Sequence, residues 1–331
     1  MSIYILIIFL SFQGGNLLYQ IKTKNLRYLN DLSDDIVIMH INDVHCGINN
    51  TIGYDGYLLY YEDLKTKYKN VIKVDVGDHI QGGVIGSISE GSVIIKIMNK
   101  VGFDVATIGN HEFDYGIEQL LKLEDNITSK YICSNFCYRK NKTTIFKPYK
   151  IINTESKKIG FIVVLTPYTL SKTYLSNLRD ENGELIYDFL IDNNGKELFD
   201  TLQNYINKLR DEEKCDYVIL LTHIGMKKSN YKDEYYTEDI ISNIEGVDAI
   251  LDGHTHAIYK TTSKDKNKKD ISINQVGTNL QAVGTLILQN GNINSEIISE
   301  IPEPNNKNNA IKIKRDKERK KDGLIKKYMI L

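Results

Sequence analysis

The sequence predicts an α/β domain in which helices pack on central β-sheets. From residue 36 to about residue 301, short apolar runs rich in β-branched residues alternate with longer segments of helical periodicity. Strands that alternate with helices in this way are typical of α/β proteins. A chain of 331 residues, 41% hydrophobic and 26% charged, is long enough to bury the core of one large domain or of two ordinary ones.

The expected elements follow one another in chain order. Strands are expected at residues 36–39, 71–76, 104–108, 158–165, 216–221 and 247–251, and helices at residues 57–68, 92–101 and 195–210. After Gly253 the pattern changes to three consecutive strands, at residues 271–275, 282–289 and 293–299. Asn290 and Gly291 lie between the last two strands, where this dipeptide predicts a hairpin turn.

Residues 1–35 are an N-terminal extension or a signal segment. Residues 3–12 form an apolar run of signal-peptide length that is too short to span a membrane, and no basic residue precedes it. A cleaved export signal would place the protein in the periplasm or outside the cell, whereas an ordinary extension would leave it in the cytoplasm. Both interpretations fit this segment. No other segment is long and apolar enough to be transmembrane.

The charges are unevenly distributed around a net charge of −1. Residues 302–331 are a polar linker and a basic tail, in which residues 312–331 carry nine Lys or Arg and three Asp or Glu. This leaves 33 of the 42 basic and 40 of the 43 acidic residues elsewhere, a balance that argues against general nucleic-acid binding. The tail itself is a solvated charged end or a segment that binds anionic lipid or nucleic acid.

The cysteines do not define a scaffold. The four of them, at positions 46, 133, 137 and 215, are too few for a disulfide framework in a chain of this length. Cys133 and Cys137 could pair or hold a metal, or they could be two ordinary thiols. The redox compartment is left open.

The histidines mark the loops of chemical interest. There are seven, at positions 40, 45, 79, 111, 223, 254 and 256. A single histidine is more often a surface or core residue than a ligand. Here every histidine lies in or beside a loop that follows an apolar strand, and open α/β sheets place ligands and catalytic groups at such strand ends.

The first two of these loops supply carboxylates. Asp43 and His45 follow the first strand two positions apart, so in extended backbone their side chains point the same way. A carboxylate and an imidazole that face one point suit Mn, Fe or Zn. Asp78 follows the second strand in a glycine-rich turn, and its two oxygens could bridge two cations. Alone, an Asp-x-His pair or a turn Asp is a weak signal.

The third loop combines a ligand with an acid. Asn110 offers a neutral carbonyl oxygen as a ligand. His111 and Asp114 are three positions apart, on one face if the segment begins a helix, so the carboxylate could orient the imidazole. This is the arrangement of a general acid with its orienting partner.

The last two loops add imidazoles only. His223 follows the strand expected at residues 216–221. His254 and His256 follow the strand expected at residues 247–251, and because they are two positions apart both can point towards one centre. The five loops together supply three Asp, one Asn and five His in order, a set that is very unlikely to arise by chance.

The sequences of these loops resemble the conserved motifs of a known superfamily. Asn-Asp-Val-His at 42–45, Gly-Asp-His-Ile-Gln-Gly at 77–82, Gly-Asn-His-Glu-Phe-Asp at 109–114 and Gly-His-Thr-His at 253–256 are similar to the signature of the calcineurin-like metallophosphoesterases. Within that superfamily they most resemble the bacterial UDP-sugar hydrolase/5′-nucleotidase family, in which His-Glu-Phe-Asp is characteristic. The resemblance runs from about residue 36 to residue 300.

The resemblance implies a fold and a ligand set. Residues 36–301 would form the catalytic domain, a four-layered α/β/β/α sandwich with the metal site at its strand ends. Two divalent ions, of Mn, Zn, Fe or Mg, would be bound. By similarity, one ion would take Asp43, His45 and His256, the other would take Asn110, His223 and His254, and Asp78 would bridge them.

The resemblance also implies a reaction. A metal-bridging hydroxide would attack the phosphorus of a small phosphate ester, expected to be a 5′-nucleotide or a UDP-sugar. His111 would protonate or stabilise the departing oxygen, and Asp114 would hold its tautomer. Relatives carry a C-terminal nucleotidase domain that this chain is expected to lack, which leaves substrate specificity and oligomeric state open. The alternative is a catalytically weak truncated fragment or a metal-binding interaction protein, although the complete ligand set argues against it.

Overall fold

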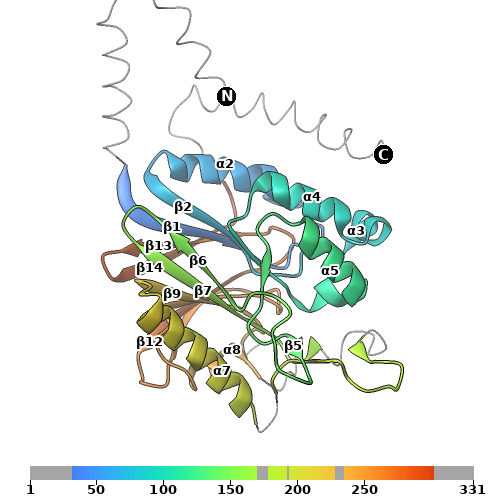
Figure 1. Cartoon of the computed structure of the whole chain (residues 1–331). Helices are drawn as coiled ribbons and strands as arrows, with labels where there is room; N and C mark the ends of the chain where they lie inside the picture. The colour runs from blue at the N-terminus through green and yellow to red at the C-terminus, as the bar shows by residue number, and fades with distance from the viewer. Residues whose placement is uncertain (1–31, 170–177, 192–193, 228–234, 302–331) are drawn as a thin grey trace, which may run out of the picture.

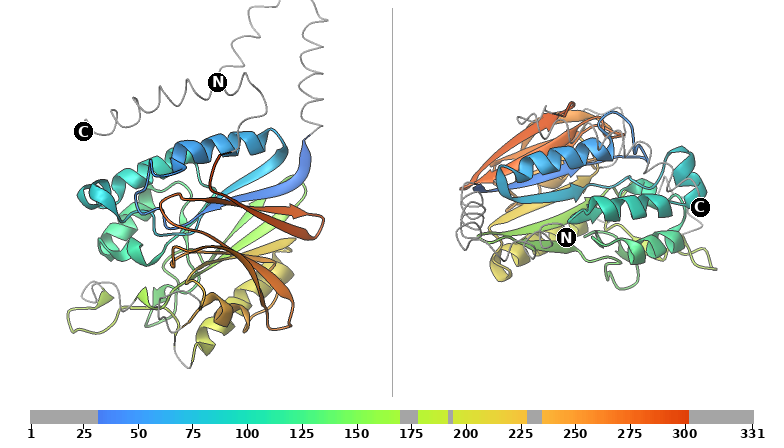
Figure 2. Two further views of the ribbon diagram at one scale, coloured as in Figure 1. Left: turned by 180° about the vertical axis from the view of Figure 1, so that it is seen from behind. Right: turned by 90° about the horizontal axis from the view of Figure 1, so that it is seen from above.

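The chain folds into two six-stranded β-sheets that pack face to face (Figure 1). The computed structural model describes residues 32–169, 178–191, 194–227 and 235–301. Helices cover the outer face of each sheet, so the layers run helix, sheet, sheet, helix (Figure 2). The predicted four-layered α/β/β/α sandwich is confirmed. The expected signal segment (residues 3–12) and the basic tail lie outside the described residues.

The first sheet has the strand order β14-β13-β1-β2-β3-β4. Its strands are β1 (Ser33–Ile41), β2 (Tyr68–Asp75), β3 (Val105–Thr107), β4 (Tyr131–Ile132), β13 (Val283–Gln289) and β14 (Asn292–Ile298). β1 to β4 are parallel to one another, and β13 runs antiparallel to β1. The helices that connect the parallel strands cover the outer face (Figure 2): α2 (Gly53–Lys65), α3 (Gly83–Ser89), α4 (Ser92–Val101) and α5 (Ile117–Asn126).

The second sheet has the strand order β11-β12-β10-β9-β7-β6. Its strands are β6 (Tyr149–Asn153), β7 (Lys158–Leu165), β9 (Tyr217–His223), β10 (Ala249–Asp252), β11 (Ile258–Lys264) and β12 (Asp270–Val276). The four central strands are parallel, and the edge strands β6 and β11 are antiparallel to their neighbours. Helix α7 (Lys196–Asn207), its extension η3 (Lys208–Glu212) and α8 (Thr237–Ile241) cover this sheet, and β5 (Cys137–Tyr138) pairs with β8 (Tyr187–Asp188) outside it.

Strand β7 shows why the sequences of the central strands are unbroken apolar runs. Phe161 and Val163 are buried in the larger core, which includes residues of both sheets. Their neighbours Ile162 and Val164 are buried with Leu198 and other residues of α7 in a second core. Because side chains alternate between the faces of a strand, a strand covered on both faces must be apolar at every position.

Most predicted elements are confirmed with boundaries shifted by a few residues. Asn290 (φ 46°) and Gly291 (φ 88°) are both left-handed, as a two-residue hairpin turn requires, and the turn joins β13 to β14. The three C-terminal strands do not lie in one sheet, however, since β12 belongs to the second sheet and β13 returns to the first. Helices α3, α5 and α8 and strands β4, β5, β6, β8 and β11 were not predicted.

Two further sequence observations have a structural outcome. All four cysteines are free, and Cys133 and Cys137 are buried as ordinary thiols. Among the described residues, no helix has the length and apolar character needed to cross a membrane.

Candidate metal centre

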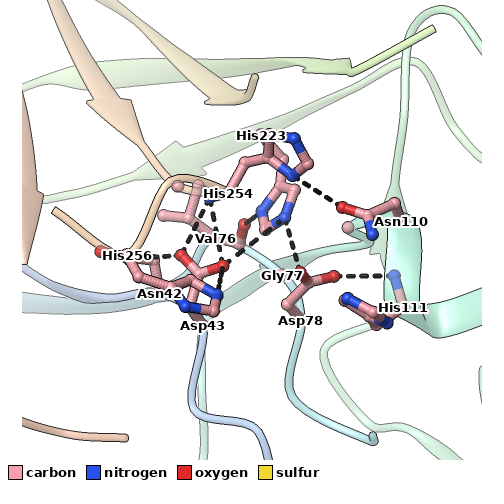
Figure 3. A network of polar contacts seen from close by, with 12 residues as sticks. Asn42, Asp43, Val76, Gly77, Asp78, Asn110, His111, His223, His254 and His256 are labelled. Carbon is pink, nitrogen blue, oxygen red and sulfur yellow. Dashed lines mark hydrogen bonds and ion pairs between the residues drawn. The ribbon is translucent and has the colours of Figure 1, made fainter. Parts of the chain in front are cut away.

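The carboxyl ends of parallel strands from both sheets meet at one place (Figure 3). From the first sheet, the loops after β1, β2 and β3 bring Asp43, Asp78 and Asn110. From the second sheet, β9 ends in His223, and the loop after β10 brings His254 and then His256. The structure therefore gathers in one centre the residues that the sequence distributes over five loops.

Asp43, His45 and His256 form the first group of potential ligands. One donor atom from each lies within 4.8 Å of the others. The two Nε2 atoms of His45 and His256 are 3.0 Å apart, and His256 Nε2 lies 3.5 Å from Asp43 Oδ1. Asp43 is fully buried, whereas His256 is partly exposed. One side of the centre is therefore open to solvent.

Asp78, His223 and His254 form the second group, and all three are buried. His223 Nε2 lies 3.0 Å from Asp78 Oδ2. Asn110 belongs beside them, because its Oδ1 is 2.8 Å from His254 Nδ1. The ligands that the resemblance implies for each ion are thus neighbours in space.

Asp78 lies between the two groups. Its Oδ2 is 3.0 Å from His223 Nε2 in one group and 3.8 Å from His45 Nε2 in the other. Burial raises the pKa of its carboxyl, but the nearby His223, His111 and His45 lower the pKa well below its ordinary value. Asp78 is therefore an anion placed where it can contact both sites.

The donor set fits divalent metal ions. Imidazole nitrogens, carboxylate oxygens and an amide oxygen suit Zn, Mn or Fe. Two imidazole nitrogens 3.0 Å apart, as in His45 and His256, repel each other unless a proton or a cation lies between them. Two nitrogen ligands of one tetrahedral zinc ion would lie about 3.3 Å apart. The first group is thus close to the spacing that an ion requires.

Hydrogen bonds behind the imidazoles select the nitrogen that faces the centre. His223 Nδ1 donates to the carbonyl oxygen of Val76 (2.7 Å), and His45 Nδ1 donates to Gln81 Oε1 (3.0 Å). In both residues Nε2 is therefore the ring nitrogen that faces the ligand groups. Metal-binding histidines in proteins are held in this manner.

His111 and Asp114 are paired as the sequence predicts. They are joined by a 2.8 Å contact from His111 Nδ1 to Asp114 Oδ2 across the 3₁₀ turn η1 (Asn110–Phe113). The His111 backbone N–H also donates to Asp78 Oδ1 (2.8 Å), and its ring lies 5.3 Å from that of His45. Burial lowers the pKa of His111, but Asp114 and Asp78 raise it by more, so that the pKa lies at about 9, above its ordinary value. The imidazole is therefore cationic at neutral pH and partly exposed beside the ligands.

The loops that carry the ligands are backbone-strained. Five of the seven predicted ligands have positive φ: Asp43 (50°), His45 (45°), Asp78 (58°), His254 (80°) and His256 (56°). The left-handed conformation costs a non-glycine residue about 1–2 kcal/mol. Such strain collects at functional sites, where the surrounding structure holds it in place.

Two glycines leave the space that the ligands occupy. A Cβ on Gly109 would lie 2.2 Å from Asp78 Oδ1 and 2.6 Å from His223 Nε2. A Cβ on Gly253 would lie 2.7 Å from His223 Nδ1. Any side chain at these positions would displace ligands, so the loop sequences are fitted to the centre.

A comparison with protein families shows which family contains a centre of this kind. Residues 36–257, which contain all nine predicted site residues, match the profile of the calcineurin-like phosphoesterases. The chain belongs to the calcineurin-like phosphoesterase family. Metal binding is a property of this family of phosphoesterases, in agreement with the two ligand groups.

Named relatives of this phosphoesterase are nucleotidases. The chain is 30% identical over 256 residues to the snake venom 5′-nucleotidase of Crotalus adamanteus. It is 27% identical over 272 residues to the 2′,3′-cyclic-nucleotide 2′-phosphodiesterase/3′-nucleotidase of Salmonella typhimurium. Each match covers 70% of this chain and 38% of the relative, so the chain spans well under half of either protein.

Solved structures support the fold. The 5′-nucleotidase precursor from Thermus thermophilus gives a TM-score of 0.67 at 19% identity and covers 88% of this chain and 59% of its own. The calcineurin-like phosphoesterase YfkN from Bacillus subtilis gives a TM-score of 0.64 at 19% identity and covers 86% of this chain and 97% of its own. At this level of identity the likeness concerns the fold.

Glu112 is a site residue of this phosphoesterase that the sequence interpretation gave no role. It is fully buried and accepts the backbone N–H groups of Gly109 (2.5 Å), Asp78 (2.8 Å), His79 (2.8 Å) and Ile80 (3.2 Å). One carboxylate thus joins the loop after β2 to the loop after β3. The only sequence signal was an acidic residue inside the 109–114 motif.

Asp252 joins the other two loops in a similar way. It is fully buried and accepts the backbone N–H groups of Gly253 (2.9 Å) and Gly225 (3.1 Å) and the hydroxyls of Thr237 and Tyr259 (both 2.7 Å). The loops that carry His223 and His254 are therefore fixed to each other. Nothing in the sequence distinguished Asp252 from an ordinary strand-end Asp.

Two of the seven histidines do not face the centre. His40 is fully buried within β1, with its ring against Gly284, and burial lowers its pKa to about 3. It is therefore a neutral core residue. His79 is also fully buried, and its two ring nitrogens form hydrogen bonds with Asp75 and Tyr131.

Proposed function

We propose that this chain hydrolyses small phosphate esters at a centre of two divalent metal ions. One observation carries the proposal: the two ligand groups lie side by side, with the Asp78 carboxylate in contact with both. In this arrangement Asp43, His45 and His256 would hold one ion, and Asn110, His223 and His254 the other. When bound, two such ions activate a water molecule and neutralise the charge of the transferring phosphoryl group.

The protein itself would supply the acid. His111 lies next to the ligands and is partly exposed, so it can reach an oxygen that departs from phosphorus. In the metal-free protein its pKa of about 9 keeps it protonated at neutral pH, and Asp114, which binds no ion in this scheme, favours the protonated form. Asp114 fixes Nδ1, which leaves Nε2–H to donate to the leaving oxygen or to stabilise its charge.

The substrate class that we infer is nucleotides. Two relatives are named for hydrolysis of 5′-nucleotides or of 2′,3′-cyclic nucleotides. The loop sequences resemble those of a family that also includes UDP-sugar hydrolases, so UDP-sugars are a second candidate substrate within the same class. Each of these presents a phosphate ester to a centre of the kind described above.

The test is turnover by the purified chain with added Mn²⁺. p-Nitrophenyl phosphate, 5′-AMP and a UDP-sugar are supplied in parallel, and Asp78→Asn serves as the inactive control. We expect metal-dependent hydrolysis of at least p-nitrophenyl phosphate and one nucleotide, abolished by the substitution. If Mn²⁺ binds but none of the three substrates is hydrolysed, the chain is a metal-binding protein and the proposed activity is wrong.

A further inference from the structure

A buried hydrogen-bonded chain lies directly behind the candidate centre. His79 Nδ1 is 3.0 Å from Asp75 Oδ1, and His79 Nε2 is 2.7 Å from the Tyr131 hydroxyl. The side chains of Asp75, His79 and Tyr131 are all almost completely buried. No step of the proposed reaction uses these residues, yet two of them flank Asp78.

The hydrogen-bonded chain of Asp75, His79 and Tyr131 adjoins a strained turn of the centre. Gly77 (φ 93°) and Asp78 (φ 58°) are consecutive left-handed residues. The turn also packs closely on the next loop, because a Cβ on Gly77 would lie 2.5 Å from the backbone nitrogen of Gly109. A turn of this kind persists only where its surroundings hold it.

One carboxylate oxygen ties together the two sides of this turn. Asp75 Oδ1 accepts the backbone N–H of Gly77 (3.0 Å), which precedes Asp78, and the imidazole Nδ1–H of His79 (3.0 Å), which follows it. Glu112 holds the same turn through the backbone N–H groups of Asp78 and His79. Asp78 is thus fixed on both sides by buried hydrogen bonds.

Tyr131 determines how the imidazole is oriented. It lies on β4, at the edge of the first sheet, and its ring stacks on that of His79 with centroids 5.6 Å apart at 28°. Because a carboxylate only accepts, His79 Nδ1 must carry the proton that goes to Asp75. The Tyr131 hydroxyl engages the other nitrogen, so the ring cannot rotate without breaking two buried hydrogen bonds.

We propose that His79 and Tyr131 are positioning residues, which with Asp75 hold the Asp78 carboxylate where it can contact two ions. The inference rests on the proposed function only in assuming that ions bind at Asp78. Among the described residues, no hydrogen bond or ion pair joins His79 or Tyr131 to a predicted ligand side chain, so the effect passes through the 77–79 backbone. Partners that orient ligands from behind typically change metal affinity or activity by about 10–100-fold when they are removed.

Three variants remove the hydrogen bonds among Asp75, His79 and Tyr131 in steps, and a fourth variant serves as a control. Tyr131→Phe removes a hydroxyl but keeps the stacked ring, His79→Asn keeps a donor towards Asp75, and His79→Leu removes both links. The control is Tyr57→Phe, which removes another fully buried tyrosine hydroxyl, hydrogen-bonded to the Met39 carbonyl oxygen at 3.3 Å. Mn²⁺ affinity by titration calorimetry and Tm are measured for each metal-free protein.

We expect Mn²⁺ affinity to fall in steps, by about tenfold or more in His79→Leu and by less in His79→Asn and Tyr131→Phe. Tyr57→Phe should lower Tm but leave Mn²⁺ affinity unchanged. Mn²⁺ affinity within twofold of wild type in both His79→Leu and Tyr131→Phe would overturn this inference and leave the proposed function standing. If His79→Leu fails to fold, the Mn²⁺ affinity of Tyr131→Phe alone tests the inference. A wild-type chain that binds no Mn²⁺ would overturn both this inference and the proposed function.

Discussion

At the scale of single residues, the centre contains buried carboxylates whose negative charge must be balanced. Asp43 and Asp78 are almost fully buried, and isolated charges of this kind cost several kcal/mol each. In the metal-free protein His223 provides part of this balance. Burial lowers the pKa of His223, but the carboxylates of Asp78 and Asp43 raise it more strongly, to about 10. Protons and metal ions therefore compete for the same sites.

We expect this competition to make Mn²⁺ affinity depend on pH. Below a pKa of about 10, His223 carries a proton that an ion must displace, so affinity should rise as pH increases from 6 to 9. Each displaced proton contributes about a tenfold gain per pH unit. Titration calorimetry at three pH values in that window measures the slope, and a flat profile would show that no imidazole titrates on binding.

His111 is expected to affect the chemical step and not metal binding. Its imidazole is assigned to the leaving group, so His111→Asn should keep its ions while kcat falls by about 10²–10⁴ for an alkyl phosphate. The loss should be smaller for p-nitrophenyl phosphate, whose leaving group needs no proton. Asp114→Asn should act in the same direction. Equal losses on both substrates would instead indicate that His111 positions the phosphate.

The sequence could predict residues that act through their own side-chain chemistry. Asp43, His45 and Asp78 stand out because residue types that bind metals are informative when they follow predicted strands. Glu112 and Asp252 were missed because most of their partners lie on other loops or elements: backbone N–H groups for Glu112, and a backbone N–H and two hydroxyls for Asp252. Such a role depends on which loops the fold brings together, and residue type carries no sign of it.

At the scale of elements, the loops after the parallel strands are shaped to aim side chains. Gly109 illustrates this, because its own backbone is extended (φ −104°) and would accept any residue. The restriction at this position comes from Asp78 and His223, which occupy the space where a side chain would lie.

We therefore expect Gly109→Ala to damage the centre more than the fold. The methyl group would lie 2.2 Å from Asp78 Oδ1, so Mn²⁺ binding and turnover should both be lost. Gly83→Ala is the matched control, since a Cβ there meets nothing within 4 Å. Its left-handed backbone (φ 58°) should cost about 1–2 kcal/mol of stability, with metal binding retained. Normal Mn²⁺ binding by Gly109→Ala would contradict the described geometry.

The elements that the sequence predicts best are the buried strands. The strand predicted at residues 158–165 is β7, because a strand covered on both faces is apolar throughout. Strand β11 was missed since its side chains alternate between exposed and half-buried at the edge of the second sheet and are largely polar. Its position follows from pairing with β12, which is a property of the folded sheet.

At the scale of the whole molecule, the centre joins two sheets. Asp43, Asp78 and Asn110 come from the first sheet, and His223 and His254 come from the second. Bound ions would therefore link the two halves of the sandwich. The strand orders that create this juxtaposition could not be derived from the strand pattern, and the four layers were expected only from the resemblance.

We expect metal ions to stabilise the folded chain. Mn²⁺ at a hundred times its Kd should add about 2.7 kcal/mol, since it binds only the native state. For a domain of about 270 residues that corresponds to a rise in Tm of about 5 °C for each site that is filled. Differential scanning calorimetry with Mn²⁺ and then with excess EDTA measures the shift and its reversal. The same rise in Asp78→Asn would mean that the ions bind elsewhere.

The central claim is that two ions act together at Asp78. The most direct test titrates the metal-free protein with Mn²⁺ while p-nitrophenyl phosphate hydrolysis is followed in the same samples. The account predicts binding of two equivalents, with most of the activity appearing as the second site fills, and neither feature in Asp78→Asn. Full activity at one equivalent, or turnover in the presence of EDTA, would contradict it.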